Sequence, residues 1–233
     1  MQNHPLSGQR IVIAGGSSGI GLEVAKQVAA AGARVVIASR SAVQKHDALR
    51  ETVGVDIETF ACDITSASDT GAFLAQVGAI DHLVFAVRPD TPPGSFAETT
   101  PEQAQATFDC KFWGQYRMIH GTREQLNSNG SIVMTSGIAG DKIYPGASTM
   151  ALINRATETL CQALAVELAP LRVNVVSPGF VAPKPAQVEQ LAQRFPLGRV
   201  AAPQEVVQCY LTLLQNPYIT GTTLVVDGGA RLL

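Results

Sequence analysis

The chain has 233 residues, of which 46% are hydrophobic and 15% are charged, and its formal net charge at pH 7 is -2. This length and apolar content predict one compact domain with a sizeable core. A charge so close to zero, without any run of lysine or arginine, argues against nucleic acid or an anionic membrane as a partner. We therefore expect a small-molecule substrate.

The cysteines and the first residues of the chain indicate whether the protein has a metal site and in which compartment it works. No cysteine pair has CxxC or metal-ligand spacing, and each cysteine lies in an apolar stretch, which predicts packed core thiols and no metal site. Residues 1–10 have no apolar signal core, and no apolar run approaches the roughly 18 residues of a membrane span. These features predict a cytoplasmic protein. The cysteines are Cys62, Cys110, Cys161 and Cys209.

Short β-branched runs alternate with longer amphipathic stretches along the chain. Near-continuous apolar strands separated by helices predict a seven-stranded parallel sheet covered on both faces, hence an α/β doubly wound fold with right-handed crossovers. Ligands would bind beyond the carboxyl ends of its strands. The expected strands are 10–14, 34–38, 57–61, 82–85, 131–135, 172–176 and 223–226.

A glycine-rich turn follows the first expected strand and precedes a helical pattern at 22–31. The spacing Gly-x-x-x-Gly-x-Gly lets backbone N–H groups approach a pyrophosphate at a helix N-terminus, whose partial positive charge favours the anion. Such a turn can be only a tight strand-to-helix connection, but its place after the first strand favours a dinucleotide site. The expected contact residues are Gly15, Ser17, Ser18, Gly19, Ile20 and Gly21.

The second expected strand is followed by Ser39 and Arg40, where an NAD-specific site usually has a carboxylate that binds the adenosine ribose hydroxyls. Neither residue is acidic. Arg40 can pair with a 2′-phosphate through a charge-assisted hydrogen bond, which predicts NADPH rather than NADH as the preferred cofactor. The alternative is a solvated surface arginine.

Two proline-rich segments, 88–94 and 182–185, interrupt the regular alternation. Each follows an expected strand, where a binding cleft would lie. The stretch 187–195 has the pattern of a short amphipathic helix over that cleft, flanked by Pro185 and Pro196. It is either a mobile lid or a packed surface helix, and the sequence favours neither.

With these glycines in place, the chain resembles the short-chain dehydrogenase/reductase family nearly from end to end. Five further motifs carry the resemblance, one after the third strand, one after the sixth and three near the C-terminus. They are Cys62-Asp63-Ile64, Asn174-Val-Val-Ser-Pro178-Gly179, Pro196-Leu-Gly-Arg199, Tyr218-Ile-Thr-Gly221 and Asp227-Gly-Gly229.

The resemblance implies a Rossmann-type oxidoreductase with a nicotinamide cofactor and a homotetrameric or homodimeric assembly. It implies one dinucleotide-binding domain over 1–233, with the cofactor part at about 8–135 and the substrate cleft and lid at about 136–200. Asp63 and Ile64 would contact the adenine. The backbone around Ala86 would line the cofactor, and Pro178 and Gly179 would border the nicotinamide.

The sequence departs from the family where the catalytic Asn, Ser, Tyr and Lys are expected. Counting along the matching motifs puts these positions at Lys111, Gly137, Met150 and Asn154. Met150 cannot donate a proton, and Asn154 can bind a ribose hydroxyl through its amide but lacks the charge that tunes a neighbouring phenol. Arg88 replaces a glycine beside the cofactor, where it either contacts a phosphate or crowds the site.

Three polar residues are candidate substitutes for the missing catalytic groups. Lys111 can donate to an oxyanion if its side chain enters the cleft, and is otherwise a helix-surface lysine. Tyr144 lies six residues before Met150 but precedes Pro145, as a rim or packing residue would. Ser136 stands one residue before the serine position, and its hydroxyl can simply satisfy backbone groups at the strand end.

A retained cofactor site beside a changed catalytic site leads to three hypotheses. The first is an atypical NADPH-dependent ketoreductase of specialised metabolism, whose enolisable or polycyclic ketone substrate supplies the proton. A general acid is worth about 10²–10⁴ in rate, and alignment of reactants can be worth more. The second is a non-redox cyclase, isomerase or dehydratase on the same scaffold. The third is an NADPH-binding pseudoenzyme or regulatory subunit.

Overall fold

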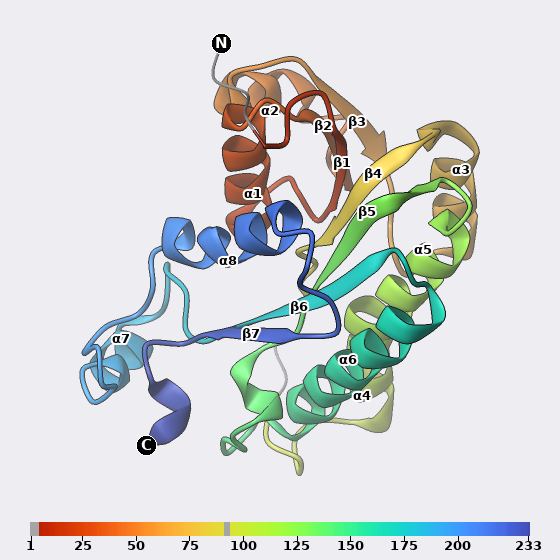
Figure 1. Cartoon of the computed structure of the whole chain (residues 1–233). Coiled ribbons are helices and arrows are strands. Elements are labelled where there is room, and N and C mark those ends of the chain that lie inside the picture. The colour runs from red at the N-terminus through yellow and green to blue at the C-terminus, as the bar shows by residue number, and fades with distance from the viewer. Residues whose placement is uncertain (1–4, 91–93) are drawn as a thin grey trace.

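The computed structural model describes residues 5–90 and 94–233 and confirms the doubly wound α/β fold. Within those residues, seven parallel strands form one sheet of order β3-β2-β1-β4-β5-β6-β7 (Figure 1). The order reverses between β1 and β4, which puts the expected ligand crevice at their carboxyl ends. The strands are β1 (Arg10–Ala14), β2 (Arg34–Ser39), β3 (Ile57–Ala61), β4 (Ile80–Phe85), β5 (Leu126–Thr135), β6 (Arg172–Pro178) and β7 (Thr223–Val226).

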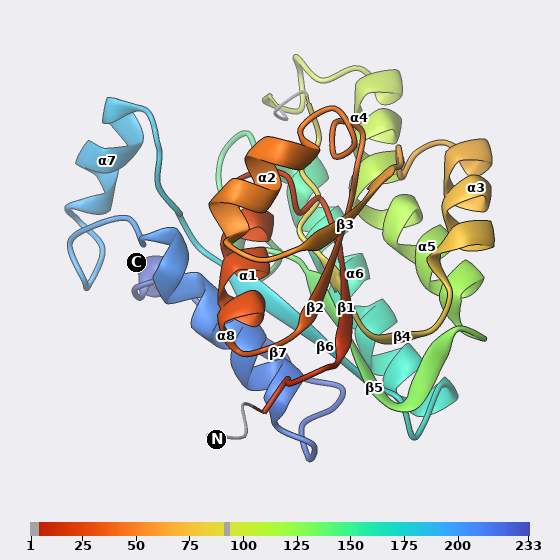
Figure 2. The ribbon, with the colours of Figure 1, turned by 90° about the horizontal axis from the view of Figure 1, so that it is seen from above.

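Helices cover both faces of the sheet (Figure 2). Helices α1, α2 and α8 lie on one face, and α3, α5 and α6 lie on the other. A π-helical turn, η1 (Asp109–Trp113), joins α4 to α5, and single 3-10 turns form η2 (Ile138–Gly140) and η3 (Ala230–Leu232). The helices are α1 (Gly19–Ala30), α2 (His46–Val53), α3 (Ala67–Val77), α4 (Pro101–Phe108), α5 (Gly114–Thr122), α6 (Ser148–Glu167), α7 (Ala186–Ala192) and α8 (Pro203–Gln215).

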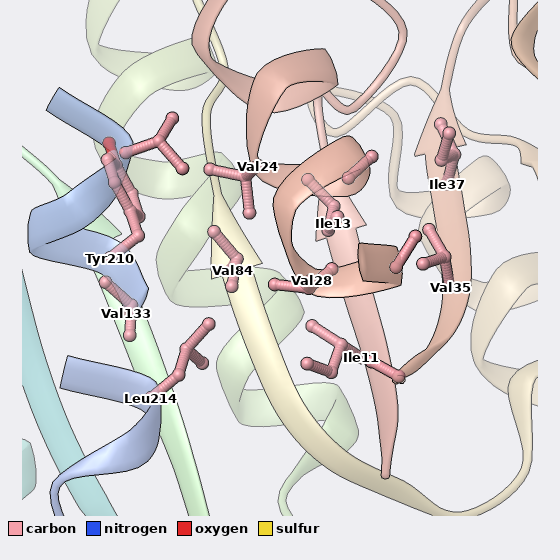
Figure 3. Packing of buried hydrophobic residues seen from close by; sticks show 14 of the residues in the cluster. Ile11, Ile13, Val24, Val28, Val35, Ile37, Val84, Val133, Tyr210 and Leu214 are labelled. Atoms are coloured by element: carbon pink, nitrogen blue, oxygen red, sulfur yellow. The ribbon is translucent and has the colours of Figure 1, made fainter. Parts of the chain in front are cut away.

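The two faces have separate cores because successive residues of a strand point to opposite sides of the sheet. In β1, Ile11 and Ile13 belong to the cluster beneath α1 and α8, whereas Val12 belongs to the cluster on the other face. Figure 3 shows the first cluster, to which α1 contributes Val24 and α8 contributes Tyr210. Both cores are closely packed, so the carboxyl ends of the strands form a fixed platform for a site.

The segment between β6 and α8 is mostly exposed, and two of its residues, Ala192 and Phe195, are buried. The expected helix at 187–195 is shorter, because α7 spans Ala186–Ala192. Beyond it, Phe195 is buried and its ring lies 5.2 Å from that of Phe180, between centroids. In this structure the segment is attached to an apolar cluster through Ala192 and Phe195. The other irregular segment, 88–94, includes 91–93, which lie outside the described residues.

All four cysteines are free, and burial raises the pKa of each thiol. Two of them, Cys62 and Cys161, are buried, while Cys110 and Cys209 are partly exposed. In 5–90 and 94–233, no group of three or more His, Cys, Asp or Glu residues is placed to hold a metal ion. None of the helices described is both long enough and apolar enough to cross a bilayer.

Candidate cofactor and active site

The glycine turn between β1 and α1 is packed closely underneath and open above. A Cβ on Gly15 would lie 2.7 Å from the carbonyl oxygen of Ala86, and a Cβ on Gly21 would collide with the carbonyl oxygen of Gly15. Gly15 also has a φ of +82°, which L side chains rarely adopt. A Cβ on Gly19, by contrast, would meet nothing within 4 Å. This open space at the N-terminus of α1 fits a bound pyrophosphate.

A cavity of about 690 Å³ lies beside this turn and is bordered by the carboxyl ends of β1 to β4. Its volume falls within the range of small-molecule sites, about 300–1,000 Å³. The residues after four strands meet in its wall because parallel strands end at the same edge of the sheet, and α4, η1 and α5 contribute further residues. The cofactor residues expected from the sequence that line it are Gly15, Ser17, Ser18, Ser39, Arg40, Asp63, Ile64 and Ala86.

Arg40 meets a carboxylate at this cavity that the sequence reasoning missed. Both terminal nitrogens of Arg40 donate to Asp90, with Nη2 2.7 Å from Oδ1. The side chains of Arg40 and Asp90 are exposed and line the cavity. Arg88 is also exposed and also lines it. Hydrogen bonding to Arg40 lowers the pKa of Asp90, and the charge of Arg88 acts in the same direction. No local signal links Arg40 to Asp90, because only the fold brings the ends of β2 and β4 together.

Three of the four positions where catalytic residues were expected, Lys111, Gly137 and Asn154, lie close together. The Lys111 Nζ donates to Asn154 Oδ1 at 2.7 Å and to the carbonyl oxygen of Ser136 at 2.8 Å. A Cβ on Gly137 would lie 3.1 Å from Asn154 Nδ2. Met150 lies one turn before Asn154 on α6 and is partly buried. Residues from η1, the end of β5 and α6 therefore meet at one place.

Lys111 lies inside the protein and not on a helix surface. It is the central residue of the π-helical turn η1, and it is only 6% exposed. In a π-helical turn the backbone hydrogen bonds join residues that are five apart instead of four. The Gln115 side chain also donates to the Lys111 carbonyl oxygen. Burial lowers the pKa of Lys111 to about 8, because a surrounding of low polarity disfavours the charged form.

Ser136 is engaged in a second buried contact beside Lys111. Its hydroxyl donates to Glu158 Oε1 at 2.8 Å, and Oε2 of the same carboxylate accepts from Arg155 at 3.2 Å. Ser136 and Glu158 are 2% and 5% exposed, so the Ser136 hydroxyl is buried and its hydrogen bond is internal to the protein. Glu158 was missed because a glutamate on an amphipathic helix has the pattern of a solvent-facing residue.

Tyr144 belongs to an apolar cluster beside α7. Its hydroxyl donates to the carbonyl oxygen of Ala230 at 3.3 Å, and its ring packs edge-on against Phe180, with the centroids 5.9 Å apart. Partial burial raises the pKa of Tyr144. Its contacts in this structure are those of a packing residue, and they do not include Lys111 or Asn154.

Comparisons with known proteins cover almost the whole chain. A family model described as Enoyl-(Acyl carrier protein) reductase matches residues 14–231. The chain is 33% identical to carbonyl reductase family member 4 of Xenopus laevis, over 94% of this chain and 96% of that protein. It is similar to the crystal structure of a small-chain dehydrogenase in complex with NADPH, with 33% identity and a TM-score of 0.84 over 97% of this chain and 100% of that chain. The structure of MalC Reductase/Diels-Alderase from Malbranchea aurantiaca is similar with 28% identity and a TM-score of 0.89, over 98% of each chain.

Proposed function

The chain belongs to the short-chain dehydrogenase/reductase family of nicotinamide-dependent oxidoreductases, and we propose that it is an NADPH-dependent ketoreductase that works without a tyrosine acid. One observation carries the proposal. The chain combines a glycine turn and a cavity that fit a dinucleotide with Met150, which has no proton to donate, at the position where the resemblance puts the catalytic tyrosine.

The chain's own residues support a dinucleotide with a 2′-phosphate. The backbone N–H groups at the start of α1 would hold the pyrophosphate. The fork of Arg40 already binds a carboxylate through both terminal nitrogens, and a phosphate accepts the same bidentate geometry. Asp90 would have to release Arg40 for the phosphate to take its place. When bound, NADPH supplies a hydride to the carbonyl carbon of the substrate.

The proton must then come from a group other than Met150. Ser136 and Tyr144 donate their hydroxyl hydrogens to protein acceptors, and the Lys111 ammonium is buried behind Asn154. We therefore assign the proton to a hydroxyl of the substrate next to its ketone. That hydroxyl passes its proton to the new alkoxide, and the resulting oxyanion regains a proton from water. An enolisable or polycyclic hydroxyketone fits this requirement.

Single-turnover mixing of the protein with NADPH and paired ketones tests this proposal. Each pair consists of a hydroxyketone and its O-methyl ether, which keeps the shape but lacks the proton. We expect the absorbance of the reduced nicotinamide to fall with the hydroxyketone and to stay constant with the ether. If it falls equally with both, substrate-supplied protonation is wrong. If it falls with neither, while NADPH binds tightly, ketone reduction is wrong, and a non-redox enzyme or an NADPH-binding pseudoenzyme or regulatory subunit is favoured.

A second candidate function is a non-redox cyclisation, isomerisation or dehydration in the same cleft. The similar protein MalC Reductase/Diels-Alderase supports it, because that protein is named for a ring-forming reaction as well as for a reduction. The absence of an acid at Met150 is also compatible with a cleft that only orients its substrate. Product formation that is unchanged when NADPH is left out would favour this candidate.

A further inference from the structure

The ligand crevice has an open half and a closed half. All described residues that line the cavity of about 690 Å³ precede β5 in the chain. On the other side, residues 135–138 at the end of β5 and Pro178 at the end of β6 are buried. A dinucleotide in a doubly wound fold binds across the point where the strand order reverses. The nicotinamide half of the cofactor and the substrate therefore need space on a side that is closed in this structure.

Three chain segments meet at the closed half in one apolar cluster. They are the segments that follow β5, β6 and β7, and they contribute Ile138, Phe195 and Ala230, all of which are buried. The remaining buried member of the cluster is another alanine, Ala192, so little fully buried apolar area holds the three segments together. Regions with few buried apolar contacts are those that open locally in a folded protein. The polar contacts between these segments therefore determine how firmly this half is closed.

The C-terminal turn η3 is fixed to the end of β7 by one carboxylate. Asp227 directly follows β7, and its oxygens accept hydrogen bonds from the backbone N–H groups of Gly229 at 2.9 Å and Arg231 at 3.0 Å. Gly229 has a φ of +82°, which L side chains rarely adopt, so the chain turns sharply there. As Figure 1 shows, the turn follows the carboxyl end of β7. The turn therefore has a fixed position relative to the sheet.

Two contacts join this turn to the loop at 138–147, which lies between β5 and α6. Arg231 Nη1 donates to Asp141 Oδ2 at 2.9 Å, and the Tyr144 hydroxyl donates to the carbonyl oxygen of Ala230 at 3.3 Å. We call these two contacts the C-terminal latch. The Arg231 and Asp141 side chains are 38% and 27% exposed, and an ion pair that water still reaches shifts an equilibrium by up to about fivefold. The C-terminal latch is therefore strong enough to favour contact and weak enough to release.

Asp141 is held on its other side by α6. Its Oδ1 accepts from Arg155 Nη1 at 3.3 Å, and the same guanidinium nitrogen donates to Glu158 Oε2 at 3.2 Å. Glu158 is buried, so these contacts connect the loop to the body of the protein. When Arg231 releases Asp141, the loop keeps its contact with α6 and separates only from the C-terminal turn. The C-terminal latch is thus the contact at which this half of the crevice can open.

We propose that the C-terminal latch keeps the β5–β7 half of the crevice closed, and that it must release before a substrate enters. The nature of the ligand that enters rests on the proposed function, whereas the closure itself does not. A closed half excludes water from a substrate bound inside it. Arg231 acts on the reaction only through the loop at 138–147, so it is a positioning residue and not a catalytic residue.

Hydrogen–deuterium exchange followed by mass spectrometry tests the closure on the protein without any ligand. The backbone N–H groups of Asp141 and Lys142 both donate to the carbonyl oxygen of Ile138, so they exchange when the loop opens. Arg231→Met removes the guanidinium and keeps an unbranched side chain. We expect the peptide that covers 138–147 to exchange about 2- to 5-fold faster in this variant than in the wild type. Peptides from β1 and β2 should exchange at the same rate in both proteins.

Two further variants separate the C-terminal latch from general effects of charge. Arg199→Met is the matched control, because it removes another exposed arginine, which pairs with Glu205 through both terminal nitrogens. Exchange at 138–147 should then equal that of the wild type. Arg231→Lys keeps the positive charge beside Asp141, so exchange at 138–147 should be slower than in Arg231→Met.

The oxidation of Met150 by dilute hydrogen peroxide tests access to the closed half. Met150 is partly buried and lies one turn before Asn154 on the same face of α6, and Asn154 packs against the loop after β5. A thioether is oxidised to the sulfoxide where peroxide reaches it. We expect this oxidation to be about 2- to 5-fold faster in Arg231→Met than in the wild type. Met118 and Met134 are fully buried and should react at the same slow rate in both proteins.

The outcomes differ for each part of the proposal. Unchanged exchange at 138–147 in Arg231→Met overturns the C-terminal latch, and faster exchange with unchanged oxidation of Met150 overturns its control of access. Faster exchange in β1 and β2 as well indicates general destabilisation and also overturns the proposal. If these results are as expected but the wild type reduces no ketone, only the proposed function fails. With a ketone that is reduced, Arg231→Met should raise kcat/KM by the same factor as the exchange rate, because more of the protein is open to substrate.

Discussion

On the β1 to β4 side of the crevice, the charged groups are exposed and pair across loops, as Arg40 does with Asp90. On the β5 and β6 side, Lys111 and Glu158 are buried, and Lys111 contacts the neutral side chain of Asn154. Water solvates both partners of an exposed pair, so such a pair separates at little cost. A buried charge that loses its partner has no such compensation. We conclude that a ligand can replace Asp90 at Arg40, whereas it must adapt to the Lys111–Asn154 pair.

Removing only one partner of the buried Lys111–Asn154 pair should have the largest effect on stability. Asn154→Leu leaves the Lys111 ammonium without its side-chain partner, and we expect the free energy of unfolding to fall by about 3 kcal/mol. Urea denaturation at neutral pH measures this change. The double variant Lys111→Met/Asn154→Leu should be closer to the wild type. Equal destabilisation in the two variants would show that the charge is not the cause.

The same pair predicts a dependence of stability on alkaline pH. The pKa of Lys111 is lowered from 10.5 to about 8 in the folded protein, so between these values the unfolded chain binds the extra proton. Stability therefore rises with pH across this window, by up to about 1.4 kcal/mol per pH unit. Between pH 8 and pH 10, we expect the free energy of unfolding of the wild type, measured by urea denaturation, to rise relative to that of the double variant. A constant difference between the two proteins would contradict a depressed pKa.

On the other side of the crevice, Gly15→Ala tests the packed underside of the glycine turn. The new Cβ would meet the Ala86 carbonyl, so we expect NADPH to bind at least about tenfold more weakly and stability to fall by about 2 kcal/mol. Gly54→Ala is the matched control, because Gly54 has a φ of +83° but nothing within 4 Å of its Cβ position. It should lose about 1 kcal/mol and keep its affinity for NADPH.

The smallest expected effect is at the exposed ion pair. Asp90→Asn removes the charge that competes for Arg40, and we expect the affinity for 2′,5′-ADP to rise by up to about fivefold, the range of a surface ion pair. Affinity for 5′-AMP, which has no 2′-phosphate, should not change. Glu102→Gln, another carboxylate on the cavity wall, is the control. A rise for both nucleotides would show that Asp90 acts on the cavity in general and not on the 2′-phosphate.

The sequence predicted all seven strands, because alternation of buried strands with amphipathic helices is a pattern of local composition. The strand boundaries show the limit of this prediction. Strand β5 begins at Leu126, ahead of Asn-Ser-Asn-Gly, which has the composition of a turn. The early start depends on Leu126 pairing with Ile80 of β4, and a pairing partner in another strand leaves no mark on the local sequence.

For the candidate site, counting along the family motifs predicted which positions to compare but not the contacts between them. Lys111 and Asn154 are in contact, and the burial of Lys111 depends on the π-helical turn, for which Asp-Cys-Lys-Phe-Trp has no recognisable signal. Asp90 and Glu158 were missed for a similar reason. Their partners lie on other elements, 50 and 22 residues away.

The clearance at Gly137 has a consequence for how this site can change over time. Because the backbone there is extended, a serine fits the conformation, but its Cβ would lie 3.1 Å from Asn154 Nδ2, so the amide would have to shift by a few tenths of an ångström. The two positions are therefore coupled, and the effect of a substitution at one of them depends on the side chain at the other.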